Sequence, residues 1–460
     1  VDFTKWTSPV PQEFNHSSIL ASPATELTVL PNGLRVATES TPFAKTATVG
    51  VWIDAGSRFE SDSTNGVAHF LEHCLFKGTK KRTTQELEVE IENMGAHLNA
   101  YTSREQTTYY AKVFKKDVAG AVDILADILQ HPRLDTTSIE RERGVILREM
   151  EEVEKENEEV LFDHLHATAF QHSPLGRTIL GPADNVRSIS KENLEEYIKT
   201  HYTAARMVLV GAGAVDHAEL VKLAEKAFAN LPTDPTSASQ LVAAQPATFT
   251  GSSVLMRDDD MPSVSFAVAF EGAKWNDPDA VTLMVMQTML GSYDKNMPGA
   301  SQMTSKLAHR VNSNDLATSF MAFNTNYADS GLFGVHCVTD NMDKVEDLSW
   351  CVMNELCNLI YSVDEDDVTA AKSLLKSNLM LHVDSGSSAI AEDIGRQYLT
   401  YGRRVSRAEL FARIDAVNPA AVKAAADRFI RDKDLAIAGM GPIQFLPDYQ
   451  WFRRRTYRLL

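Results

Sequence analysis

Two histidines and a glutamate lie within one short segment of the chain, His69-Phe70-Leu71-Glu72-His73. If this segment is helical, His69 and His73 share one face, because residues four apart lie above one another on a helix. Both imidazoles can then reach the same metal ion. Glu72 lies beside that face, where its carboxylate can accept a proton from a water molecule. The order H-x-x-E-H is the inverted form of a known zinc-binding helix motif, so the segment predicts hydrolytic chemistry at one Zn²⁺ ion.

A zinc site of this kind needs a third protein ligand and an open position for water or substrate. An acidic stretch downstream, 139–159, has the period of a long amphipathic helix. Glu142 and Glu149 within it are seven residues apart, so they fall on nearly the same face, two turns from each other. One carboxylate can ligate the metal while the other orients a ligand from behind. The spacing alone does not decide between them, and a solvated helix with an accidental pattern remains the alternative.

The composition predicts a globular protein with more than one domain. The chain has 460 residues, of which 44% are hydrophobic and 23% charged, which is too long for one ordinary core. The net charge of −17 argues against nucleic acid as a partner and favours cationic partners. Apolar runs fall short of the roughly 20 residues of a membrane-spanning helix, so we expect no transmembrane segment. Because the chain begins with Val1 and not Met, we expect that a targeting segment has been removed.

The residue pattern places the motif between strands and helices. The expected elements are a hairpin at 28–37, a strand at 48–53, the metal helix at 64–76, a helix at 83–94, paired strands at 98–101 and 107–113, and helices at 118–129 and 139–159. A helix and a strand ending in Gly-x-Gly at 191–215 recur at 418–443, and the strand before the metal helix recurs at 264–272. In the second copy, the helix expected at 279–290 has Met284-Val285-Met286 where the first has metal ligands. The second half therefore keeps the fold without the metal chemistry.

The repeat predicts an α+β fold with two homologous domains from an internal duplication. Each domain is expected to be a mostly antiparallel sheet with helices packed on one side. The expected divisions are an N-terminal arm (1–25), a catalytic zinc-binding domain (26–230), a linker (231–250), a second, non-catalytic domain (251–446) and a C-terminal tail (447–460).

From Leu27 onward the chain resembles the pitrilysin-type metallopeptidases. The stretches that carry the resemblance are Pro31-Asn32-Gly33-Leu34-Arg35-Val36, Gly56-Ser57-Arg58-Phe59-Glu60, His69 to Thr79, and Leu98-Asn99-Ala100-Tyr101-Thr102-Ser103-Arg104-Glu105. The position of the family's third metal ligand corresponds to Glu149, and that of its auxiliary glutamate to Glu142. The resemblance therefore implies that His69, His73 and Glu149 hold zinc and that Glu72 and Glu142 serve catalysis.

Within this family, the chain resembles the β-type subunits of mitochondrial processing peptidases and the core subunits of ubiquinol–cytochrome c reductase, respiratory complex III. This implies removal of N-terminal presequences from imported proteins. By position, Glu159 and Asp163 would hold an arginine before the cut, with a solvated acidic helix as the alternative. Phe76 would line the pocket after the cut or belong to the core. Asn99 and Ala100 would lie on an edge strand that pairs with the peptide, unless that strand is interior.

The same resemblance implies the partners and the location. It points to a homologous α subunit that lacks the ligands, to other subunits of complex III and to cationic presequence peptides. The expected location is the mitochondrial matrix, on the matrix side of the inner membrane, and the basic tail is expected to dock on a partner. Two alternatives stay open: a structural core subunit of complex III with a vestigial peptidase site, and a broad-specificity oligopeptidase of bacterial type. The complete set of ligands in this chain favours a working peptidase.

Overall fold

The structure is a computed structural model that describes residues 23–41, 43–297, 305–383 and 385–457. Most of the expected N-terminal arm and the last three residues of the tail lie outside this range. Within the described residues, no helix combines the length and the apolar character needed to cross a bilayer.

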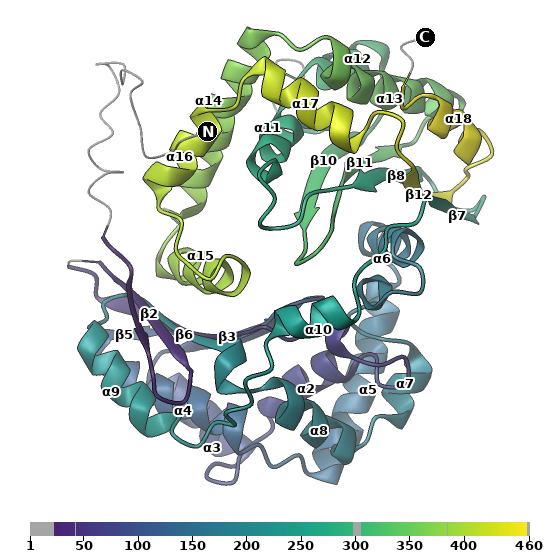
Figure 1. The fold of residues 1–460 in the computed structure, drawn as a ribbon. Helices are drawn as coiled ribbons and strands as arrows, with labels where there is room; N and C mark the ends of the chain where they lie inside the picture. The colour runs from purple at the N-terminus through teal and green to yellow at the C-terminus, as the bar shows by residue number, and fades with distance from the viewer. Residues whose placement is uncertain (1–22, 42, 298–304, 384, 458–460) are drawn as a thin grey trace.

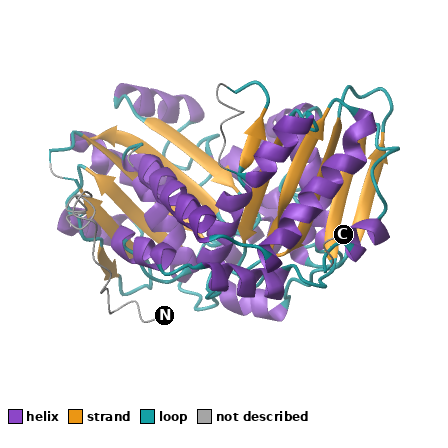
Figure 2. Ribbon diagram, turned by 90° about the horizontal axis from the view of Figure 1, so that it is seen from above, coloured by secondary structure: helices purple, strands orange, loops and turns teal. Residues whose placement is uncertain are grey.

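Two six-stranded sheets form the two halves of the molecule, and seen from above their strands form two separate groups (Figures 1 and 2). The first sheet has the order β1-β2-β6-β3-β5-β4 and the second β7-β12-β8-β11-β10-β9. The strands of the first half are β1 (Glu26–Val29), β2 (Arg35–Ser40), β3 (Thr46–Ile53), β4 (His97–Thr102), β5 (Thr107–Phe114) and β6 (Met207–Gly213). Those of the second are β7 (Ser252–Arg257), β8 (Val264–Glu271), β9 (Ser292–Asp294), β10 (Ser319–Asn326), β11 (Gly331–Thr339) and β12 (Leu435–Gly441).

Five strands of each sheet follow the same path. In the first half, β2 pairs with β6 in parallel, and β6, β3, β5 and β4 then follow as antiparallel neighbours. In the second half, β7 pairs with β12 in parallel, and β12, β8, β11 and β10 follow in the same antiparallel way. This common order confirms the α+β fold with two homologous halves.

Most helices of each half cover one face of that half's own sheet. The helices of the first half are α2 (Val67–Leu75), α3 (Thr84–Asn93), α4 (Val118–Gln130), α5 (Thr136–Val153), α6 (Asn157–Ala169), α7 (Ala183–Ser188), α8 (Lys191–His201), α9 (His217–Ala227) and α10 (Ala238–Ala244). Those of the second are α11 (Ala280–Leu290), α12 (Lys306–Asn314), α13 (Val345–Tyr361), α14 (Glu365–Val383), α15 (Ser387–Thr400), α16 (Arg407–Asp415), α17 (Pro419–Phe429) and α18 (Tyr449–Arg454).

The two halves exchange one helix each. Helix α6 of the first half packs on strands β12, β8 and β7 of the second, and α15 of the second half packs on β6, β3 and β2 of the first (Figure 1). Leu161 and Leu165 of α6 are fully buried against the second sheet, and Ile394 of α15 is fully buried against the first. Each sheet is therefore covered on its second face by the other half, which holds the two halves together.

The long acidic helix expected at 139–159 is in fact two helices. Helix α5 ends at Val153, and Glu156 has an extended backbone (φ −88°, ψ 90°) before α6 begins at Asn157. Between Val153 and Val160 the chain has no apolar residue that could hold a continuous helix against the core, and like charges on adjacent turns repel. The expectation of one helix was therefore wrong, and α6 is free to leave the first half.

The C-terminal tail packs on its own chain. Phe452 of α18 is fully buried in the core of the second half, and the guanidinium of Arg455 lies 3.6 Å from the centre of the Trp451 ring. Docking on a partner stays a prediction for the remaining surface of this segment.

Candidate active site

The helix that carries the histidines is fixed by its apolar side. Gly66 precedes α2 with φ 103°, a left-handed conformation that favours glycine, and a Cβ there would lie 2.5 Å from the carbonyl oxygen of Leu180. The buried apolar residues of α2 are Val67, Ala68, Phe70, Leu71, Cys74 and Leu75. Because these side chains face the core, Glu72 and His73 lie on the partly exposed side, with the buried His69 one turn before His73.

Glu149 of α5 meets both histidines. Its carboxylate oxygens lie 3.2 Å from Nε2 of His73 and 3.6 Å from Nε2 of His69. The ligand atoms of the three residues all lie within 4.8 Å of one another, and they form the only such group among the described residues. Two imidazoles and one carboxylate match the protein ligands of hydrolytic zinc sites, in which the fourth position belongs to water or substrate. The residues therefore fit the expected metal.

Electrostatics in this group also favour a cation. Hydrogen bonds from His69 and His73 hold the pKa of the Glu149 carboxyl well below its usual range. Burial alone would lower the pKa of His73, but the carboxylates of Glu149 and Glu142 outweigh it and the pKa is raised. The site thus draws positive charge toward its centre, which a divalent ion supplies better than protons do.

Glu142 lies behind His73. Its Oε2 is 3.3 Å from Nδ1 of His73, its Oε1 is 3.1 Å from Nζ of Lys77, and only 6% of the residue is exposed. The two glutamates that sequence spacing could not separate therefore have different places. Glu149 faces the Nε2 atoms of both rings, whereas Glu142 contacts the opposite side of one ring and orients it.

Glu72 is held by a residue that the sequence analysis did not single out. The hydroxyl of Thr102, at the end of β4, donates a hydrogen bond of 2.6 Å to Oε2 of Glu72. Thr102 belongs to one of the stretches that carry the family resemblance, which was the available signal. The contact ties the candidate base on α2 to the strand expected to bind substrate.

Strand β4 is the outermost strand of the first sheet, as expected for Asn99 and Ala100. Asn99 is exposed, and its side-chain oxygen accepts a hydrogen bond of 2.8 Å from the backbone N–H of Ala100. That N–H therefore points away from β5, to the side where an added strand would pair.

Phe76 is half-buried with its ring centre 6.1 Å from that of Tyr109, so part of it remains accessible.

Asp163 and Glu159 lie one turn apart on α6 but differ in their surroundings. Nη2 of Arg104 donates a hydrogen bond of 2.6 Å to Asp163, and the Arg104 side chain is 10% exposed. Glu159 is exposed. One of the two acids expected to bind a substrate arginine is therefore already paired with Arg104 of the same chain. The sequence did not indicate this contact.

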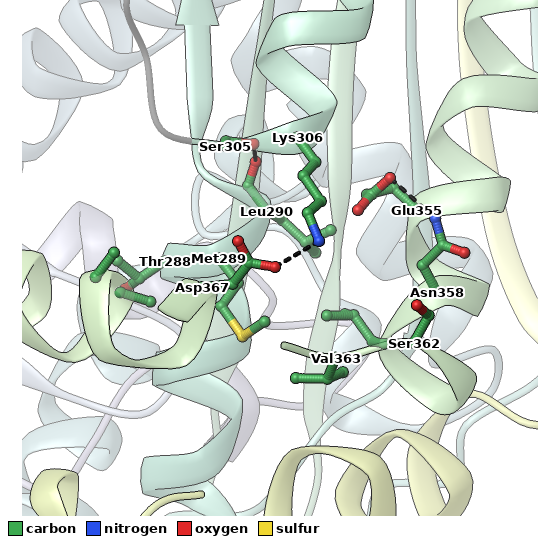
Figure 3. A pocket seen from close by; sticks show the side chains of 13 residues that line it. Thr288, Met289, Leu290, Ser305, Lys306, Glu355, Asn358, Ser362, Val363 and Asp367 are labelled. Atoms are coloured by element: carbon green, nitrogen blue, oxygen red, sulfur yellow. Dashed lines mark hydrogen bonds and ion pairs between the residues drawn. The ribbon is translucent and has the colours of Figure 1, made fainter. Parts of the chain in front are cut away.

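A hollow in the second half does not resemble this site (Figure 3). Its volume of about 50 Å³ holds a few water molecules and no peptide. Its charged groups are already paired, with Lys306 Nζ 2.5 Å from Asp367 and Asn358 donating to Glu355. Among the described residues, the group that can hold a metal ion lies in the first half.

A helix with two histidines, a carboxylate from a second helix, a glutamate beside them and an edge strand together define a metallopeptidase. Two family models match the chain. Residues 35–183 match Insulinase (Peptidase family M16), and residues 188–375 match the Peptidase M16 inactive domain. The chain belongs to peptidase family M16, which confirms the expected pitrilysin-type family. The first model covers the metal-binding group, and the second begins within the first half, ahead of α8 and β6, and extends to residue 375.

Curated relatives agree over nearly the whole chain. A probable mitochondrial-processing peptidase subunit beta from Arabidopsis thaliana is 63% identical, covering 99% of this chain and 85% of the relative. The mitochondrial-processing peptidase subunit beta of Neurospora crassa is 54% identical, covering 93% of this chain and 90% of the relative. A solved chain in complex III2 from Candida albicans is 26% identical with a TM-score of 0.83, covering 95% of this chain and all of the other.

Proposed function

We propose that this chain is the zinc-bearing catalytic subunit of a processing peptidase that removes N-terminal presequences from proteins imported into mitochondria. The observation that carries the proposal is the convergence of His69, His73 and Glu149 beside Glu72, with ligand atoms within 4.8 Å of one another. The names of the relatives, mitochondrial-processing peptidase subunit beta, support a role in the processing of mitochondrial proteins.

In this reaction, His69, His73 and Glu149 would hold Zn²⁺, which when bound polarises the scissile carbonyl and lowers the pKa of a water molecule. Glu72 takes the proton of the attacking water and later delivers it to the leaving amine. Thr102 holds one oxygen of Glu72, which leaves the other oxygen to accept the proton. Glu142 keeps the ring of His73 turned with Nε2 toward Glu149.

The substrate is an extended cationic presequence. Its backbone adds to the free edge of β4 beside Asn99 and Ala100, and an arginine before the cut meets Glu159 and Asp163. Phe76 lines the pocket for the residue after the cut. The net charge of −17 attracts such peptides from a distance.

The proposal includes a homologous α subunit without metal ligands, which closes the site, and a place on the matrix side of the inner membrane. The likeness to a chain of complex III favours a second function, as a core subunit of that complex. Both functions are compatible, because the similarity to complex III covers the whole fold whereas the metal-binding group takes up only three side chains of α2 and α5. Sedimentation of the native protein with or without cytochromes separates an integrated subunit from a free one.

The experiment that tests the proposal combines metal analysis with cleavage of a presequence peptide, using the full chain with its α partner. Glu72→Gln is expected to keep one zinc per chain and to lose about a thousandfold in turnover. His73→Ala is expected to lose both zinc and activity. Glu88→Gln on the exposed face of α3 is the matched control and should leave both unchanged. Normal turnover of Glu72→Gln would remove Glu72 from the mechanism, and cleavage of generic oligopeptides at the same rate would contradict the substrate class.

A further inference from the structure

The turn between β10 and β11 brings a carboxylate of the metal-free half into contact with the first half. Oδ1 and Oδ2 of Asp329 each accept a hydrogen bond of 2.7 Å from the guanidinium of Arg58, which belongs to the first half and is 3% exposed. The same guanidinium donates a hydrogen bond of 2.6 Å to Glu105. Glu105 in turn accepts the backbone N–H of Ala328, next to Asp329, at 3.0 Å. An ionic cluster of the buried Arg58 and Glu105 and the half-buried Asp329 therefore joins the two halves.

Arg58 is connected to the metal helix through Glu60. Arg58 is the middle residue of a single 3-10 turn at Ser57–Phe59, Glu60 directly follows this turn, and 6% of Glu60 is exposed. The Glu60 carboxylate accepts the N–H groups of Gly66 at 2.9 Å and Ala68 at 2.7 Å. These are amides at the N-terminus of α2, where Gly66 has no side chain of its own to cap the helix. Glu60 thus sets the position of the helix turn that carries His69.

Arg58 also contacts the chain just after β4, the strand whose Thr102 donates a hydrogen bond to Glu72 of α2. Its backbone N–H donates a hydrogen bond of 2.8 Å to the carbonyl of Arg104, and its side chain binds Glu105. Both lie just beyond Thr102, whose hydroxyl donates to Glu72. One buried arginine is therefore in contact with the segments that fix both the metal helix and the base.

We infer that Asp329 is a positioning residue for the reaction of the first half. It holds Arg58, and through Arg58 the segment that caps α2 and the end of β4. The inference rests on the proposed function and gives the half without metal ligands a part in catalysis. Without Asp329, the Nη2 group of a nearly buried guanidinium loses its acceptor, and Arg58 must move to find another. The cap on α2 and the Thr102 end of β4 then lose a common support.

The test measures three quantities on Asp329→Asn, Arg58→Lys and wild type in the full chain. These are zinc affinity, kcat and KM for a presequence peptide with the α partner present, and hydrogen exchange at the amides of 66–70. Asp329→Asn is expected to lower zinc affinity and kcat by about tenfold each, with KM within about twofold, and to speed exchange at 66–70. Arg58→Lys keeps the charge but not the two-pronged contact, so a smaller loss is expected. Asp259→Asn is the control, since Asp259 forms a similar pair with Arg257 on the exposed surface.

Equal kcat, zinc affinity and exchange in Asp329→Asn and Asp259→Asn would overturn the inference while leaving the proposed function intact. A wild-type chain that binds no zinc would instead end the proposed function and with it the catalytic part of the inference; exchange at 66–70 would then show only whether Asp329 supports the N-terminus of α2. If Asp329→Asn does not fold, Arg58→Lys gives the same three measurements and the same decision.

Discussion

Thr102 at the end of β4 donates a hydrogen bond of 2.6 Å to Oε2 of Glu72 on α2. A glutamate in the middle of a helix face has several rotamers, and this contact selects one of them. The hydroxyl leaves one carboxylate oxygen uncommitted, as a base that accepts a proton from water requires.

Replacing Thr102 with Val keeps the shape of the side chain and removes the donor. Glu72 then loses a hydrogen bond to a charged group, which contributes about 1.5–3 kcal/mol, so we expect kcat to fall about tenfold or more. KM and zinc content should stay near wild type, because the Thr102 hydroxyl bonds to Glu72 and the substitution leaves the backbone of β4 unchanged. Thr102→Ser retains the hydroxyl and should retain most of the activity. Steady-state cleavage of one presequence peptide gives kcat and KM, and metal analysis gives the zinc content. Equal kcat for the Val and Ser variants would contradict a role for this contact.

The contact of Arg104 with Asp163 predicts different functions for the two acids of α6. Arg104 balances the charge of Asp163, so the exposed Glu159 supplies the net attraction for a substrate arginine. Glu159→Gln should therefore raise KM several-fold for a peptide with arginine before the cut, and not for the same peptide with citrulline there. Comparing the two peptides measures this directly.

Asp163→Asn is the contrasting change. It leaves a buried guanidinium without its countercharge, so we expect the free energy of unfolding to fall by about 1–3 kcal/mol and KM to rise for both peptides. Urea denaturation checks the first effect. An Asp163→Asn chain of full stability that loses only its preference for arginine would contradict this division of roles.

The sequence predicted the local part of the site well, because helix periodicity alone places His69, Glu72 and His73 together. It could not decide between Glu149 and Glu142, since both lie on one face of α5 and only contacts with α2 distinguish them. Family position resolved that choice where physical reasoning from spacing did not. Thr102 and Arg104 were within the recognised stretches, but nothing in their spacing indicates which carboxylate each one meets.

Long-range placement was outside the reach of periodicity. The apolar face of α6 is visible in the sequence as Leu161 and Leu165, but the pattern does not say that it packs on the sheet of the other half. Asp329 lies between Ala328 and Ser330 before a glycine, which is the ordinary composition of a turn. Its contact with Arg58, 271 positions earlier, becomes visible only when the halves are assembled.

The low pKa of the buried His201 predicts that the free energy of unfolding decreases as the pH falls below neutral. Burial, and then the nearby Arg206, lower the pKa of His201 to about 3, and Nη1 of Arg206 lies 2.6 Å from Nδ1, which must therefore accept. The unfolded chain takes up a proton near pH 6.5, whereas the folded chain does so only near pH 3. Between these values unfolding binds a proton, so stability is fully present above pH 6.5 and is lost as the pH falls, by up to about 5 kcal/mol. His201→Gln keeps an acceptor for Arg206 and should flatten this slope.

Chemical denaturation at several pH values between 7 and 4 measures the slope for wild type and His201→Gln. His97→Gln, at an exposed position on β4, is the control and should follow wild type. Parallel curves for all three chains would show that His201 does not contribute.

Because α15 packs tightly on the first sheet, we expect alanine to have opposite effects on stability at two helical glycines. Gly395 of α15 lies against the fully buried Trp52, and a Cβ at this position would be 2.3 Å from two atoms of the indole ring. Alanine normally stabilises a helix interior by up to about 1 kcal/mol relative to glycine. At Gly395 the ring cannot give way, because Trp52 is enclosed and its Nε1 donates to Glu392 at 3.0 Å. We therefore expect Gly395→Ala to destabilise the chain by about 2 kcal/mol.

Gly144→Ala on α5 is the matched comparison, since a Cβ there meets nothing within 4 Å and should stabilise by up to about 1 kcal/mol. Urea midpoints of the two variants give the sign of each effect. Gly395→Ala should also lower peptidase activity. Tyr101 of β4 donates a hydrogen bond of 2.6 Å to Glu392 of α15, and a shift of α15 would break it. Two stabilised variants would mean that α15 is not held tightly against Trp52, and the exchanged helices could then not be what keeps the two halves in register.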